Sequence, residues 1–209
     1  MQIAILTFDG FNELDSFIAA GILNRMAAKG WKAHIVAPAP CVTSMNGVTI
    51  EAQRGLEFAA EADAVLFGSG IHTRDVARDE ALLGRIRLDP ARQLIGAQCS
   101  GTLLLAKLGL LGDRPACTDL TTRPWVIEAG VKVLDQPFYA EGNVATAGGC
   151  LASQYLAVWL LLRGAGRADA VAAMHYVAPV GQKDEYVARA LASVEPFVVA
   201  PAAANCLPA

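Results

Sequence analysis

At residues 94–111 the chain reads LIGAQCSGTLLLAKLGLL. An apolar, strand-like run ends abruptly at Cys99, and after Ser100 and Gly101 a helix-forming run continues to Leu111. A strand that turns into a helix with a nucleophile at the corner is typical of a nucleophile elbow, with cysteine in place of the commoner serine. Because the amides and dipole of a helix N-terminus favour an anion, we expect a Cys99 thiolate near neutral pH. The alternative is a buried core cysteine.

Composition restricts the classes of function. A length of 209 residues suits one sizeable α/β domain, and a net charge of −3 provides no basic patch for nucleic acid or an anionic membrane. We expect no signal peptide and no membrane span, because the longest apolar run, 151–162, is interrupted by polar residues. An odd cysteine count without C-x-x-C spacing indicates neither a disulfide framework nor zinc, so we expect a reducing, cytoplasmic location. The five cysteines are Cys41, Cys99, Cys117, Cys150 and Cys206.

Apolar runs alternate with segments of helical spacing along most of the chain. We expect strands at 2–8, 32–37, 62–67, 92–98, 115–118, 131–133 and 144–146, and a hairpin at 41–51. We expect helices from Leu14 to a closing Gly30, at 73–87, after Cys99, and at 123–129, 148–163, 168–176 and 184–191. This alternation predicts a single doubly wound, mostly parallel sheet with helices on both faces. We expect one domain over residues 1–195 and an irregular tail over 196–209.

The working residues of such a sheet lie at the carboxyl ends of its strands. That rule selects segment 9–15, segment 68–72, the elbow at 99–101, Asp119, and the Gly148–Gly149 pair. Asp15 begins a helix among apolar neighbours, where desolvation favours the protonated carboxyl and a role as proton donor or relay. Asp15 as a helix-capping carboxylate is an equally good interpretation.

The turn Gly68-Ser69-Gly70 follows a buried strand. Small residues there allow backbone amides to approach a substrate, and together with the amide of Ser100 they predict an oxyanion-type pocket. The turn matches neither the Walker pattern nor G-x-G-x-x-G, which argues against a phosphate loop.

Histidine is the usual partner that activates a catalytic cysteine. His72 lies on the loop after Gly70, where it could reach the cleft formed at the carboxyl ends of the strands. A solvated loop histidine is the more frequent case. We expect structural roles for His34 and His175. The sequence therefore does not predict a Cys-His-Asp triad.

These segments together resemble the ThiJ/PfpI superfamily, whose fold is flavodoxin-like and related to class I glutamine amidotransferases. The residues that carry the resemblance are CSGTLLLAKLGLLG at 99–112, FNELD at 11–15, VLFGSG at 65–70 and NVATAGG at 143–149. The pair Leu14–Asp15 is similar to the Leu-Asp pair of the isonitrile hydratase branch. Three positions depart from the family pattern: Ser69 replaces a glycine, Asp119 replaces the histidine that many relatives carry, and Tyr155 stands where many relatives in the hydratase and regulator branches have an acidic residue.

The resemblance implies a cysteine-dependent enzyme nearest to isonitrile hydratase. Cys99 would attack the terminal carbon of a small electrophilic isonitrile, Asp15 would manage the protons, and the product would be an N-substituted formamide. It also implies a homodimer without metal or organic cofactor. The alternatives are a glyoxalase- or deglycase-like enzyme, which Asp119 disfavours, and a non-enzymatic ligand or redox sensor in which Cys99 is oxidised. A peptidase is the weakest alternative because the histidine is missing.

Overall fold

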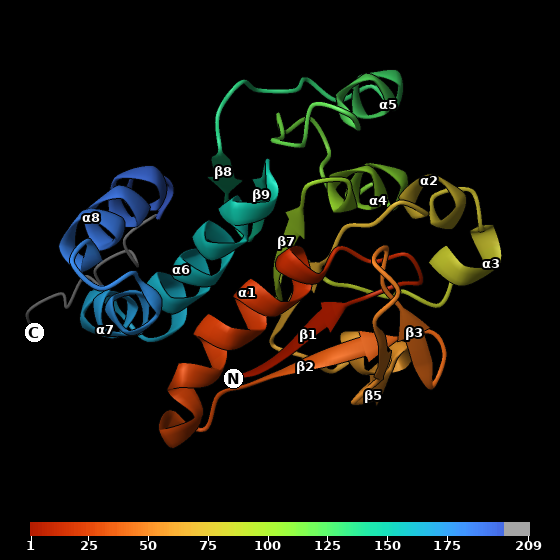
Figure 1. Ribbon diagram of the computed structural model, residues 1–209. Helices are drawn as coiled ribbons and strands as arrows, with labels where there is room; N and C mark the ends of the chain where they lie inside the picture. The colour runs from red at the N-terminus through yellow and green to blue at the C-terminus, as the bar shows by residue number, and fades with distance from the viewer. Residues whose placement is uncertain (199–209) are drawn as a thin grey trace, which may run out of the picture.

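A computed structural model describes residues 1–198, and its centre is a seven-stranded sheet (Figure 1). Six strands run parallel, and only the edge strand β8 pairs antiparallel with its neighbour β9. In sheet order the strands are β5 (Arg54–Gly55), β2 (Lys32–Ala37), β1 (Gln2–Leu6), β6 (Ala64–Phe67), β7 (Leu94–Gln98), β9 (Val144–Ala147) and β8 (Phe138–Glu141). The expectation of a mostly parallel, doubly wound sheet is confirmed.

Alternating side chains of the sheet belong to two separate hydrophobic cores, one on each face. In β1, Ile3 and Ile5 belong to one buried cluster, while Ala4 and Leu6 belong to the other. Successive side chains of a strand point to opposite faces, so a strand that is apolar throughout must be covered on both. The continuous apolar run near the N-terminus therefore forms a strand in the middle of a sandwiched sheet.

Helices cover both faces of the sheet (Figure 1). One face carries α1 (Glu13–Leu23), η1 (Asn24–Lys29), α6 (Ser153–Gly164), α7 (Arg167–Val177) and α8 (Lys183–Val194). The other face carries η2 (Leu56–Ala60), α2 (Thr73–Val76), α3 (Glu80–Leu83), α4 (Gly101–Lys107) and α5 (Arg123–Glu128). Two short 3-10 segments are η3 (Cys150–Ala152) and η4 (Glu195–Phe197).

Three parts of the expected secondary structure were wrong. The helix expected at 73–87 is two four-residue helices, because the Asp79 side chain accepts a hydrogen bond from the amide of Leu82 and starts α3 afresh. The strands expected at 115–118 and 131–133 reduce to one isolated bridge between Ala116 and Val133. A strand that we did not expect, β8, is the neighbour that pairs with β9 across the turn at Gly142.

The first helix also ends earlier than expected. α1 stops at Leu23, and the 3-10 helix η1 continues to Gly30, whose φ of 76° closes the segment in the left-handed region. The expected hairpin forms as β3 (Cys41–Thr43) and β4 (Thr49–Glu51). Most of the expected tail, 199–209, lies outside the described residues, and residues 195–197 are helical rather than irregular. No helix in the described part of the chain is long and apolar enough to cross a bilayer.

Candidate active site

The elbow cysteine has an unusual backbone conformation. Cys99 has a φ of 46°, the one positive value among the described non-glycine residues. Such a conformation costs about 1–3 kcal/mol and persists only where its surroundings fix it. Here the Cys99 amide donates to the carbonyl of Ala147 (2.9 Å), and the carbonyl of Cys99 accepts from the hydroxyl of Thr118 (2.8 Å).

Glycine beside the elbow lets backbone segments approach one another. A Cβ on Gly101 would lie 2.6 Å from the carbonyl oxygen of Gly68, and a Cβ on Gly70 would lie 2.5 Å from that of Gly10. Both contacts are with backbone, which cannot swing aside as a flexible side chain would. These glycines therefore hold the turn after β6, the elbow and the loop after β1 against one another.

Asp15 is not the cap of α1. The N-cap is Asn12, whose side chain accepts from the amide of Leu14, and the Glu13 carboxylate accepts from the side chains of Ser44 and Asn46. Asp15 is 2% exposed, and one of its oxygens accepts from the hydroxyl of Ser69. Its other oxygen, Oδ1, has no hydrogen-bond partner within residues 1–198. A buried carboxyl with an unpaired oxygen is poorly stabilised as an anion.

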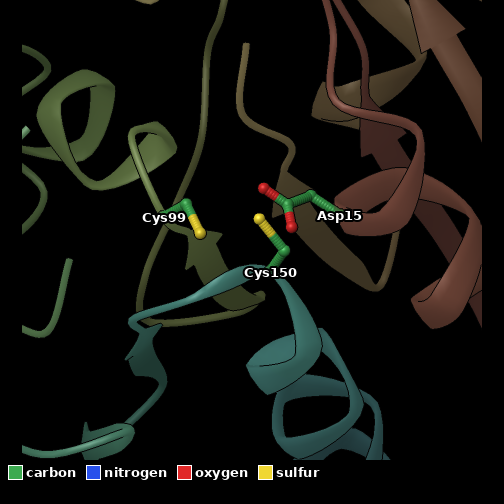
Figure 2. A group of neighbouring side chains, drawn as sticks. All are labelled: Asp15, Cys99 and Cys150. Atoms are coloured by element: carbon green, nitrogen blue, oxygen red, sulfur yellow. The ribbon is translucent and has the colours of Figure 1, made fainter. Parts of the chain in front are cut away.

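Asp15, Cys99 and Cys150 form one cluster (Figure 2). A carboxylate oxygen and the two sulfur atoms all lie within 4.8 Å of one another. Each sulfur also faces an amide N–H: the Asn12 side chain donates to Cys150 (3.1 Å), and the Gln98 side chain lies 3.6 Å from Cys99. We call this group the Cys-Asp-Cys cluster. It joins the start of α1, the elbow after β7 and the segment after β9.

Burial governs the protonation of the cluster. It raises the pKa of the Asp15 carboxyl above the ordinary aspartate range, because desolvation outweighs the Ser69 hydrogen bond. Burial also raises the pKa of the Cys99 thiol, and the nearby Asp15 carboxylate raises it further. Burial thus raises the pKa of both groups, which opposes the Cys99 thiolate that we expected from the helix N-terminus.

The glycine turn contributes fewer oxyanion donors than expected. The amide of Gly68 donates to the carbonyl of Leu6 (2.9 Å), and the amide of Gly70 donates to the hydroxyl of Ser100 (3.2 Å). Within residues 1–198 the amides of Ser69 and Ser100 donate to no acceptor. Of the four expected donors, these two are the ones whose amides have no acceptor in the described chain.

No histidine of the described residues joins the cluster. His72 is exposed, and its imidazole lies 3.7 Å from the exposed carboxylate of Asp75. His34 is buried at the opposite part of the sheet, against Gln2 and Phe58, and His175 is exposed on α7. The absence of a Cys-His pair among these residues agrees with the sequence analysis.

Asp119, Gly148 and Gly149 line a neighbouring cavity of about 590 Å³. One oxygen of Asp119 accepts from the amides of Thr121 and Thr122, and its Oδ2 is buried without a partner in the described chain. The Asp119 charge raises the pKa of Asp15, so the cavity and the cluster are electrostatically connected. The Gly149 carbonyl accepts from Gln98 (2.7 Å).

Cys150 is the site residue that sequence reasoning missed. It is 51 residues from Cys99, and the two meet because β7 and β9 are neighbours in the sheet. A signal was present, since Cys150 directly follows the Gly148–Gly149 pair that the strand-end rule selected.

The parallel sheet and the cysteine elbow can now be compared with those of known protein families. The model of the DJ-1/PfpI family matches residues 1–162. The chain belongs to the DJ-1/PfpI family. No curated protein sequence matches it.

Solved structures of the family share the fold. DJ-1 from Schizosaccharomyces pombe is 19% identical, with a TM-score of 0.72, over 86% of this chain and 100% of that one. A ThiJ/PfpI family protein from Pseudomonas syringae is 21% identical, with a TM-score of 0.72, over 91% of this chain and 89% of that one. A mutant of a DJ-1 superfamily protein from Salmonella typhimurium is 24% identical, with a TM-score of 0.72, over 85% of this chain and 98% of that one.

Proposed function

We propose that this DJ-1/PfpI protein hydrates small isonitriles to N-substituted formamides, with Cys99 as nucleophile and Asp15 as proton carrier. The observation that carries the proposal is the buried Asp15 carboxyl beside the Cys99 sulfur, with no histidine in the described cluster. The Leu14–Asp15 pair, similar to that of the isonitrile hydratase branch, supports the same choice.

The proposed chemistry uses Asp15 as an acid next to the Cys99 thiol, since burial raises the pKa of both groups. The Asp15 acid donates its proton to the terminal carbon of R–N≡C, which makes that carbon electrophilic. The Cys99 sulfur then bonds to the same carbon, and Asp15 recovers a proton from the thiol. Water adds to the resulting thioimidate and expels the sulfur, and R–NH–CHO leaves. No thiolate has to exist before the substrate binds.

The remaining site groups have defined tasks in this proposal. The free amides of Ser69 and Ser100 stabilise negative charge when water adds to the thioimidate. Ser69 also donates to Asp15, which orients the carboxyl toward the sulfur. The cavity beside Gly148 and Gly149 provides room for the group R.

A direct comparison of substrates tests this function. We expect purified protein to convert para-nitrophenyl isonitrile to the formamide and to leave methylglyoxal largely unchanged, because no histidine assists carbonyl chemistry in the described cluster. Product formation is followed by chromatography for both substrates under identical conditions. Faster consumption of methylglyoxal would favour a glyoxalase- or deglycase-like function, and the absence of turnover with either would favour a sensor.

We also propose that residues 1–195 act as one domain in a cytoplasmic homodimer. Leu14 and Phe17 on α1 and Leu151 on η3 are 48%, 39% and 67% exposed, and apolar side chains of this kind near a site are typical of a contact surface.

A further inference from the structure

Cys150 has no task in isonitrile hydration, yet its sulfur lies beside that of Cys99 in a shared cluster (Figure 2). We propose that the two cysteines form a peroxide-reducing pair: a hydroperoxide oxidises Cys99, and Cys150 resolves the product as an intramolecular disulfide. This activity needs the two thiols and Asp15 but not isonitrile turnover, so it stands independently of the proposed function.

The geometry permits the bond. The sulfurs are within 4.8 Å of one another. A disulfide requires about 2.05 Å between sulfurs. Changing one cysteine to another staggered rotamer moves its sulfur by roughly 3 Å, which covers the difference. The Gln98 side chain donates to the Gly149 carbonyl (2.7 Å) and so holds the Cys150 segment against the elbow.

The Cys150 segment also has freedom to adjust. Cys150 begins η3, a three-residue 3-10 turn outside the sheet, and it follows Gly149, which has a φ of 92° and open space around its Cα. Cys99, by contrast, is held by hydrogen bonds to Ala147 and Thr118. We therefore assign Cys150, on the short turn, as the resolving cysteine and Cys99, at the elbow, as the one that the hydroperoxide oxidises. Cys150 is half-buried and Cys99 is buried, so solvent reaches the pair from the Cys150 side.

The chemistry balances in two steps. The Cys99 sulfur attacks the terminal oxygen of a hydroperoxide ROOH, the S–O bond forms, the O–O bond breaks, and ROH leaves with the thiol proton relayed by Asp15. Cys99 is then a sulfenic acid, oxidised by two electrons. The Cys150 sulfur attacks the Cys99 sulfur, the S–S bond forms, and hydroxide leaves with the Cys150 proton as water. The sum is two thiols and ROOH giving a disulfide, ROH and water; an external dithiol restores the thiols.

The surrounding donors favour this pair over the other cysteines of the described chain. Amide N–H groups of Gln98 and Asn12 face the two sulfurs and stabilise negative charge as each sulfur attacks. Cys117 is fully buried and lies outside the cluster. Cys41 lies exposed on the β3–β4 hairpin, outside the cluster.

The test is mass spectrometry of the reduced full-length protein after one equivalent of hydrogen peroxide. We expect a loss of about 2 Da that dithiothreitol reverses, with a linked peptide pair containing Cys99 and Cys150. Cys150→Ser should instead gain about 16 or 32 Da on Cys99, as sulfenic or sulfinic acid. The matched control Cys41→Ser should still form the linked peptide.

The wild-type protein alone also decides the question, should the Cys150 variant fold poorly. Accumulation of sulfinic acid on Cys99 with no linked peptide would overturn the proposal, and so would linkage of Cys99 to any other cysteine. Because the readout is a mass and not isonitrile turnover, its failure is distinguishable from failure of the hydratase function.

Discussion

Replacing Cys99 by alanine is expected to reduce isonitrile turnover by at least about 10³-fold, because removal of a covalent nucleophile leaves only binding and polar stabilisation. The measurement is the steady-state rate of formamide formation with para-nitrophenyl isonitrile. The variant should remain folded, since alanine keeps the Cβ and removes a sulfur whose contact with the Gln98 side chain is long (3.6 Å).

Cys41→Ala is the matched control, because Cys41 is exposed on the β3–β4 hairpin. It should keep the wild-type rate. A Cys99→Ala enzyme with more than a tenth of wild-type activity would show that the sulfur does not carry the reaction.

The second large effect is expected for Asp15→Asn, which keeps the shape of the side chain and removes its proton-carrying ability. We expect kcat to fall by about 10²- to 10⁴-fold, the range for loss of a general acid–base group. The amide also retains an oxygen that accepts from Ser69, so KM should change little. A variant with unchanged kcat would remove Asp15 from the mechanism.

The same substitution is expected to stabilise the protein, with a defined pH dependence. Burial raises the folded-state pKa of Asp15, so the wild type loses stability as pH rises above the ordinary aspartate range, where only the unfolded chain ionises freely. Below the unfolded pKa the penalty is absent. Asp15→Asn should therefore raise the thermal midpoint at pH 8 and have a smaller effect near pH 3.5, as calorimetry would measure. An equal effect at both pH values would contradict a perturbed carboxyl.

Local signals were sufficient for β1 and β6, because each is an almost entirely apolar run between breakers. They failed at two other places. Segment 73–87 has helical spacing throughout, but the Asp79 side chain caps a new helix within it. β8 carries Tyr139 and Glu141 among its four residues and lies at an edge, where the apolar pattern is weak and pairing with β9 supplies the stability.

The candidate site, too, could be predicted from the sequence only in part. Cys99 was identifiable because a strand, a small residue and a glycine in series specify an elbow. Its pKa was not, because burial depends on what packs around the sulfur, and burial raises the pKa of the thiol here. Cys150 reaches the site only through the adjacency of β7 and β9, which involves strands 46 or more residues apart in the chain.

The most direct test of the central claim is detection of the covalent intermediate. Wild-type protein is mixed with para-nitrophenyl isonitrile, quenched in acid within one turnover and analysed by intact mass and peptide mapping. The account predicts one added isonitrile per chain, located on Cys99 and absent in Cys99→Ala. Formation of the formamide with Cys99 unmodified at every quench time, or an adduct on Cys150 instead, would contradict it.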